Sequence, residues 1–145
     1  MSRRDRFHDA LRRTLEKDGW TITADPLILR LGGTDLKADL GAEKTFAAQK
    51  EGRKIAIELK EFTAISGVSE LEKTMGQLQL YQWALDVQEP DRMLFLAVNQ
   101  TAYRKYFLKP LFQLAVERNK INLIIYRPDL EEIVQWIIQD DTLNF

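Results

Sequence analysis

Lys54-Ile55-Ala56-Ile57-Glu58-Leu59-Lys60 is a short apolar run that ends in an acid and a base two residues apart. We interpret it as a β-strand, in which residues two apart point to the same face. Glu58 and Lys60 would then project together, while Ile57 and Leu59 enter the core. The run therefore predicts a strand that carries a carboxylate and an ammonium group side by side.

Asp39 lies nineteen residues upstream of Glu58, in a stretch from 37 to 49 that also has the pattern of a strand. Glu51-Gly52-Arg53 predicts the hairpin turn that joins the two strands, which makes them antiparallel neighbours. Gly41 permits the bend or bulge that Asp39 needs in order to approach Glu58. We therefore expect two carboxylates and one lysine in a small volume.

Such a set of side chains suits the cleavage of phosphodiester bonds. Carboxylate oxygens are the ligands that Mg²⁺ prefers, and the ion usually takes one or two of them together with waters and substrate phosphates. A lysine beside the ion can hold or activate the attacking water, or steady a phosphate. The structural alternative is an ordinary solvated strand face, because alternating charges are common there and pair across the strand.

The composition is that of one soluble globular domain, which we assign to residues 1–145. No apolar run approaches the roughly 20 residues that a membrane span requires, and the amphipathic start lacks the apolar segment of a signal peptide. The absence of cysteine and the single histidine leave little material for a structural zinc site, thiol catalysis or a Ser-His-Asp triad. We expect a cytoplasmic protein with no membrane partner.

The net charge of −1 is low for a protein that attracts DNA by charge alone. The charge is uneven, because residues 1–60 carry 13 Lys and Arg against 10 Asp and Glu, whereas residues 61–145 carry 8 against 12. Five arginines gather on or before the first predicted helix: Arg3, Arg4, Arg6, Arg12 and Arg13. They form either a solvated helix face or a phosphate-contacting patch.

Periodicity along the chain predicts an α/β (α+β) fold, with a central mixed β-sheet flanked by helices. The predicted helices are residues 4–18, 69–87, 101–107, 110–116 and 128–138. The predicted strands beyond the two around Asp39 and Glu58 are residues 20–31, which Pro26 breaks into an edge strand or two short pieces, 93–98 and 121–126. The last two lack polar alternation, which is typical of central strands covered on both faces.

The helix over residues 69–87 has a predicted capping box at its start, formed by Ser69 and Glu72. Helical spacing predicts its buried stripe, which consists of Leu71, Met75, Leu78 and Leu85. Leu80 and Trp83 fall on a different side. The helix is therefore either buried by a second layer or in contact with another subunit or a partner protein.

The order of elements, with Asp39 on one strand and Glu58-Leu59-Lys60 on the next, resembles the core of the PD-(D/E)XK endonuclease-like superfamily. Gln77-Leu78-Gln79-Leu80-Tyr81 is similar to the Gln-x-x-x-Tyr motif that RecB-type members carry on the following helix. Residue 38 is Ala, where the superfamily pattern has proline. The resemblance implies a restriction-endonuclease-like core and a Mg²⁺-dependent DNA endonuclease.

Several blocks over nearly the whole chain resemble the XisH family. These blocks are residues 18–23, 25–27, 39–44, 55–62 and 89–92. The resemblance implies a cyanobacterial factor that controls excision of the fdxN element, a DNA segment removed during heterocyst differentiation. It also implies a companion protein called XisI and a site-specific recombinase that performs the strand exchange.

We assign roles to the site residues as hypotheses. Asp39 and Glu58 bind one Mg²⁺ or Mn²⁺ ion, with the carbonyl of Leu59 as a further ligand. Lys60 orients or deprotonates the attacking water, or offsets charge on the phosphate in the transition state. Gln77 positions Lys60, a metal-bound water or a DNA phosphate, unless it is simply a satisfied polar residue at a helix edge.

Other polar side chains have two readings each. Glu43 either adds a carboxylate to the site or pairs with Lys44 or with a residue on the neighbouring strand. His8 and Asp9, on the first predicted helix, either line the cleft or lie at the surface or core edge. Tyr81 is expected to be a packing aromatic residue whose hydroxyl lies at the rim.

Three functions follow from these readings. The first is a metal-dependent DNA endonuclease, for which cleavage of a duplex would favour a homodimer because one active site cuts one strand at a time. The second is a DNA-binding factor that regulates recombination without turnover. The third is an interaction module that contacts a protein partner, the XisI-like companion or the recombinase, through Leu80 and Trp83.

Overall fold

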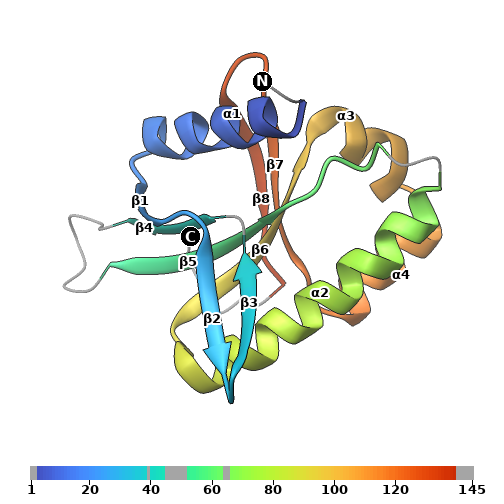
Figure 1. Cartoon of the computed structure of the whole chain (residues 1–145). Helices are drawn as coiled ribbons and strands as arrows, with labels where there is room; N and C mark the ends of the chain where they lie inside the picture. The colour runs from blue at the N-terminus through green and yellow to red at the C-terminus, as the bar shows by residue number, and fades with distance from the viewer. Residues whose placement is uncertain (1–2, 39, 45–51, 64–65, 140–145) are drawn as a thin grey trace.

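The computed structural model describes residues 3–38, 40–44, 52–63 and 66–139, which form two β-sheets with helices packed around them (Figure 1). The large sheet has six strands in the order β1-β4-β5-β6-β7-β8, and the small sheet pairs β2 with β3. No helix within these ranges is long and apolar enough to cross a membrane.

The large sheet is mixed, as predicted. Strands β5, β6 and β7 are parallel, and the other neighbouring pairs are antiparallel. The strands are β1 Thr21–Ala24, β2 Leu27–Leu31, β3 Thr34–Ala38, β4 Leu40–Lys44, β5 Arg53–Leu59, β6 Arg92–Asn99, β7 Asn122–Arg127 and β8 Glu132–Ile137. The helical elements are α1 Arg3–Lys17, α2 Gly67–Gln88, α3 Gln100–Ala102, the π-helix η1 Tyr103–Phe107 and α4 Pro110–Arg118.

The central strands are buried on both faces, as their continuous apolar runs predicted. One face packs against α1, and its core includes Leu11, Leu15, Ile55, Ile57, Leu59, Phe95, Ile124 and Tyr126. The other face packs against α2 and the β2–β3 hairpin, and its core includes Leu27, Leu29, Ala56, Leu78, Leu85, Leu96 and Val98. Because Ala56 belongs to the α2 side, strand alternation places Glu58 on that side as well.

Helix α2 starts two residues before the predicted capping box. Ser66 is the N-cap, and its hydroxyl oxygen accepts a hydrogen bond from the backbone N–H of Ser69 at 3.2 Å. The prediction that Ser69 is the cap is therefore wrong. Gly67 is the first residue of the helix, and a Cβ at this position would lie only 2.5 Å from a ring carbon of Tyr106. A glycine thus allows the first turn of α2 to approach η1.

The prediction of one strand over residues 37–49 is wrong. Gly32 and Gly33 have φ values of +57° and +82°, which glycine tolerates, and they form the tight turn between β2 and β3. The second strand of this hairpin starts at Thr34 and ends at Ala38. The large sheet receives a separate strand, β4. The sequence pattern joined these two strands because it could not show that they belong to different sheets.

The predicted helix over residues 128–138 is also wrong, because residues 132–137 form β8. This strand lies antiparallel to β7 at the edge of the large sheet. Its isoleucine, valine and tryptophan residues suit a strand. Trp136 packs edge-on against Phe95, with ring centroids 5.3 Å apart, and also contacts Trp20 at 5.7 Å. Tertiary packing of this tryptophan thus favours the strand over the helix that was predicted for residues 128–138.

Candidate functional site

Glu58 and Lys60 lie together at the carboxyl end of β5. The Lys60 Nζ atom is 3.5 Å from Oε1 of Glu58, and the two side chains are 20% and 7% exposed. The backbone N–H of Lys60 donates to the carbonyl of Ala97 at 3.1 Å, which continues the pairing of β5 with β6 past the last strand residue. The backbone that carries this acid–base pair is therefore fixed by the centre of the sheet.

Burial makes this ion pair energetically sensitive. A buried carboxylate costs several kcal/mol of solvation free energy unless an opposite charge or hydrogen bonds compensate it. The separation of 3.5 Å is longer than the roughly 2.7–2.9 Å of a tight charge-assisted hydrogen bond. Lys60 therefore neutralises Glu58 without closing tightly on it.

Asp39 lies outside the residues that the structure describes. Both of its neighbours are described: Ala38 ends β3, and Leu40 begins β4 by pairing with Ile57 of β5. Ile57 directly precedes Glu58. Within the described ranges, no three His, Asp or Glu side chains are grouped so that they could hold a metal ion. The predicted metal site therefore depends on Asp39.

Leu59 and Gln77 are placed on opposite sides of β5. The side chain of Leu59 is buried in the α1-side core, so only its backbone could be a metal ligand. Gln77 lies on α2, which covers the face that carries Glu58. Its Oε1 atom is buried and has no hydrogen-bond partner among the residues that are described. Tyr81, one turn further along, is a buried core residue, as its packing interpretation predicted.

His8 belongs to a cluster that links α1 to the bend between β1 and β2. Its Nε2 atom is 3.0 Å from Oδ1 of Asp25, and Arg12 donates to Oδ2 of the same carboxylate at 2.8 Å. Asp9 lies 3.8 Å from the other ring nitrogen of His8. Of the two alternatives for His8 and Asp9, these contacts favour a position at the edge of the core, where they hold α1 in place. Glu43 pairs through its backbone with Lys54, and its side chain is outside the described part of the chain.

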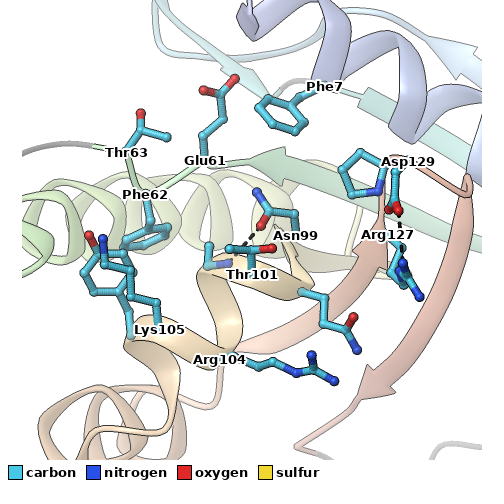
Figure 2. Close-up of a pocket in the computed structure, with 14 residues that line it drawn as sticks. Phe7, Glu61, Phe62, Thr63, Asn99, Thr101, Arg104, Lys105, Arg127 and Asp129 are labelled. Carbon is cyan, nitrogen blue, oxygen red and sulfur yellow. Dashed lines mark hydrogen bonds and ion pairs between the residues drawn. The ribbon is translucent and has the colours of Figure 1, made fainter.

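A cavity of about 930 Å³ opens immediately beyond Lys60, at the carboxyl ends of the three parallel strands (Figure 2). Glu61 follows β5, Asn99 ends β6 and Arg127 ends β7. The lining residues are Phe7, Glu61, Phe62, Thr63, Asn99, Gln100, Thr101, Ala102, Arg104, Lys105, Tyr106, Arg127, Pro128 and Asp129. This is the edge where open sheets with parallel strands usually bind ligands.

Sequence reasoning missed this cavity. The sequence does contain a signal for the cavity, because a polar residue ends or follows each of the three parallel strands. This signal can be recognised only when the order of the strands in the sheet is known. Asn99 had a further structural signal, because its side-chain oxygen accepts from the backbone N–H of Ala102 at 2.8 Å and caps α3. The helix predicted to begin at residue 101 therefore begins one residue earlier, at Gln100. Thr101 lines the cavity.

Charges of both signs line the cavity. Arg104 and Lys105 come from η1, and the Lys105 Nζ atom is 5.2 Å from the ring centroid of Tyr106. Arg127 donates to Asp129 at 3.0 Å, and this hydrogen bond lowers the pKa of the Asp129 carboxyl. The Oε1 atom of Glu61 is buried and, among the described residues, lacks a hydrogen-bond partner. The cavity thus presents the cations of Arg104 and Lys105 and the Glu61 Oε1 acceptor to a ligand.

Comparisons with known proteins identify the family. The XisH protein family model matches residues 1–134. The crystal structure of an XisH family protein from Nostoc punctiforme PCC 73102 is 40% identical over 92% of this chain and 99% of that chain, with a TM-score of 0.83. That of an fdxN element excision controlling factor protein from Anabaena variabilis is 38% identical over 92% and 98%, with a TM-score of 0.81. No curated protein matches the chain in sequence. This chain belongs to the XisH family.

Proposed function

We propose that this protein controls the programmed excision of a DNA element and contributes to it a metal-dependent endonuclease site at Asp39, Glu58 and Lys60. The first part is supported by the Anabaena variabilis protein, which is a fdxN element excision controlling factor and aligns with almost its whole length. The second part rests on one observation, the pairing of the buried Glu58 with the half-buried Lys60 at the carboxyl end of β5. A PD-(D/E)XK-type relationship is part of this proposal.

The buried pair favours chemistry over a structural role. Replacing a buried ion pair by apolar side chains of similar volume is often neutral or stabilising. Glu58 projects from β5 to the α2 side of the sheet, where the core residues are apolar. Folding alone would therefore be served as well by two apolar residues. A carboxylate and an ammonium group held at this depth are better explained by a reaction that uses their charges.

The available ligands fit Mg²⁺ or Mn²⁺. The carboxylates of Asp39 and Glu58 and the carbonyl of Leu59 are all oxygen donors, which these hard cations prefer. The ion, when bound, would activate a water molecule and polarise the phosphate. Pairing of Leu40 with Ile57 brings the chain that follows Asp39 next to the strand that carries Glu58, which supports the use of both carboxylates.

Lys60 and Gln77 would act on the substrate side of the site. The ammonium group of Lys60, 3.5 Å from the Glu58 carboxylate, can hold a water molecule or a phosphate oxygen beside that acid. It would thereby orient the nucleophile and offset the charge that develops on the phosphate. Gln77 has a buried side-chain oxygen on the helix that covers this face, so it can accept a hydrogen bond from a water held there.

A specific observation favours a second function, that of a regulator that binds a protein partner without cutting DNA. Leu80, Trp83 and Val87 of α2 are 48%, 57% and 67% exposed. They are three and four residues apart, so they form one apolar stripe on the surface of the helix. An XisI-like companion, the recombinase or a second copy of the chain would bury this stripe. Family resemblance favours the companion.

The test is a cleavage assay with plasmid, single-stranded and four-way-junction DNA, in the presence of Mg²⁺ or Mn²⁺. We expect Glu58→Ala and Lys60→Ala to lose cleavage by about 100-fold or more, because each removes a charge that acts in the transition state. Glu72→Ala and Lys73→Ala remove the same charges from exposed positions on α2 and should cut normally. Circular dichroism of each variant checks that it is folded.

Metal binding provides a second readout. A functional site should raise the unfolding temperature when Mg²⁺ is added, and this increase should disappear in Asp39→Ala. If no form of the protein cuts DNA, with the companion protein present as well, and Mg²⁺ has no effect on unfolding, the endonuclease proposal is wrong. The exposed stripe of α2 would then carry the function.

A further inference from the structure

The cavity begins one residue after the candidate catalytic pair. Glu61 follows Lys60 directly and lines the cavity, whereas Glu58 and Lys60 lie before it on β5. The cavity and the pair are therefore one residue apart along the chain at this end of β5. The cavity also contains residues from three parallel strand ends and from η1, so the fold and not a single loop determines its shape.

Cations occupy one side of the cavity. Figure 2 shows Arg104 and Lys105 on the η1 side, and Arg127 on the neighbouring β7, with Glu61 and Phe7 on the opposite side. Arg104 and Lys105 are exposed. Among the described residues Arg104 makes no ion pair, so its guanidinium group is available to a ligand. Guanidinium and ammonium groups that line an open space suit phosphate oxygens.

The lining does not resemble a site for an apolar metabolite. Such sites are lined mainly by apolar and aromatic side chains, whereas polar and charged residues form most of this wall. The apolar part consists largely of the aromatic rings of Phe7, Phe62 and Tyr106. Cations beside aromatic rings are the combination that binds single-stranded nucleic acid, in which phosphates pair with cations and unpaired bases stack on rings.

The size of the cavity distinguishes a single strand from a duplex. Its volume of about 930 Å³ is near the upper end of the roughly 300–1,000 Å³ of ligand pockets. It can therefore enclose an unpaired nucleotide, whereas a duplex could only lie across its mouth. The carboxylate of Glu61 repels phosphate and, with its buried oxygen lacking a partner within the described ranges, can accept from a base N–H or a sugar hydroxyl. This polarity orients a nucleotide with its phosphate toward Arg104.

We propose that this cavity binds an unpaired nucleotide of a single DNA strand, with the phosphates on either side of that nucleotide held by Arg104, Lys105 and Arg127. The strand would continue past Glu61 to Glu58 and Lys60, and in that respect the proposal rests on the proposed function. The binding itself does not depend on cleavage. It would recruit an unpaired end or flap rather than intact duplex DNA.

The test measures binding without cleavage, by fluorescence anisotropy of a labelled oligothymidylate in EDTA at several salt concentrations. We expect the double substitution Arg104→Ala/Lys105→Ala to weaken binding by about fivefold or more. It should also lower the slope of log affinity against log salt by about 1.4, since each phosphate contact on a single strand contributes about 0.7. Lys73→Ala/Arg118→Ala removes two exposed cations outside the cavity and should leave both values unchanged.

A substitution of opposite sign makes the test independent of unfolding. Asp129→Asn removes a negative charge and frees Arg127 from its 3.0 Å bond, so it should tighten binding, whereas Asp91→Asn at an exposed position elsewhere should not. Duplex DNA, thymidine monophosphate and inorganic phosphate serve as competitors. Equal loss of affinity in the cavity variant and its control would overturn the proposal, as would competition by duplex, nucleotide or phosphate at least as strong as that by single strand. The Glu58→Gln variant should still bind oligothymidylate although it no longer cuts DNA. Its binding therefore tests this proposal separately from the endonuclease proposal.

Discussion

The Glu58–Lys60 pair and the cavity that begins at Glu61 are neighbours in the chain, but they differ in their access to water. The side chains of the pair are 7% and 20% exposed, whereas Arg104 and Lys105 of the cavity are exposed. Charges interact strongly where water is excluded and weakly where it is present. The comparison shows that two kinds of charge can lie at one end of a sheet. The charges of Glu58 and Lys60 affect the stability of the fold, whereas those of Arg104 and Lys105 are accessible to a polyanion.

Removal of the cation that pairs with Glu58 should have the largest effect on stability. Lys60→Met leaves the Glu58 carboxylate in the core without its 3.5 Å partner, so we expect a loss of about 3 kcal/mol in the free energy of unfolding. Urea denaturation measures it. Lys73→Met, an exposed position on α2, should change stability by less than about 0.5 kcal/mol.

A double substitution isolates the charge effect from the loss of packing. Glu58→Leu/Lys60→Met removes both charges and should recover most of the stability that Lys60→Met loses, because no ion remains buried. Equal stability of Lys60→Met and Lys73→Met would show that water screens the pair and that its burial has no energetic consequence.

The wall of the cavity can be disturbed without touching the pair. Gly67→Ala places a Cβ 2.5 Å from the Tyr106 ring, which lines the cavity, so the ring or α2 must move. We expect a destabilisation of about 2 kcal/mol and weaker oligothymidylate binding. Thermal unfolding and anisotropy measure the two effects.

Gly76→Ala is the matched control in the same helix. Nothing lies within 4 Å of the added Cβ, and alanine is a better helix former than glycine, so this variant should be stabilised by about 0.5–1 kcal/mol. A change of the same sign in both variants would mean that contact with Tyr106 does not determine the effect at residue 67.

The exposed cations should be nearly irrelevant to folding. Arg104→Ala removes a charge that water already screens, and we expect the free energy of unfolding to change by less than about 0.5 kcal/mol. Urea denaturation under the conditions used for Lys60→Met checks this directly. A loss as large as that of Lys60→Met would place Arg104 among the residues that hold the fold.

Local patterns predicted the parts of the fold that depend on local physics. The apolar runs of β6 and β7 and the amphipathic α1 were predicted from periodicity, and the structure confirms them. Residues 132–137 were assigned to a helix because Pro128 is a frequent first helical residue. Their strand is stabilised by pairing with β7 and by contact of Trp136 with Phe95, which are long-range interactions that a local pattern does not contain.

The two candidate sites differ in the same way. Glu58 and Lys60 could be placed together from the sequence, because strand alternation alone brings residues two apart to one face. The cavity could not be predicted from the sequence, because its lining residues Glu61, Arg104 and Arg127 come together only when β5, β6 and β7 lie parallel and in that order. Pairing order is a property of the whole chain, so composition and spacing carry little information about it.

The smallest expected effect concerns the titration of Asp129. Its pKa is lowered in the folded protein, chiefly by the hydrogen bond from Arg127. The pair therefore favours the folded state above the pKa that Asp129 has in the unfolded chain, and this contribution disappears as the pH falls through the lower, folded pKa. NMR titration should show the pKa of Asp129 return toward its ordinary value in Arg127→Ala.

Bound oligothymidylate should also raise the pKa of Asp129, because a phosphate that binds Arg127 weakens the hydrogen bond from Arg127 to Asp129. An unchanged pKa on binding would remove Arg127 from the phosphate site and leave that role to Arg104 and Lys105.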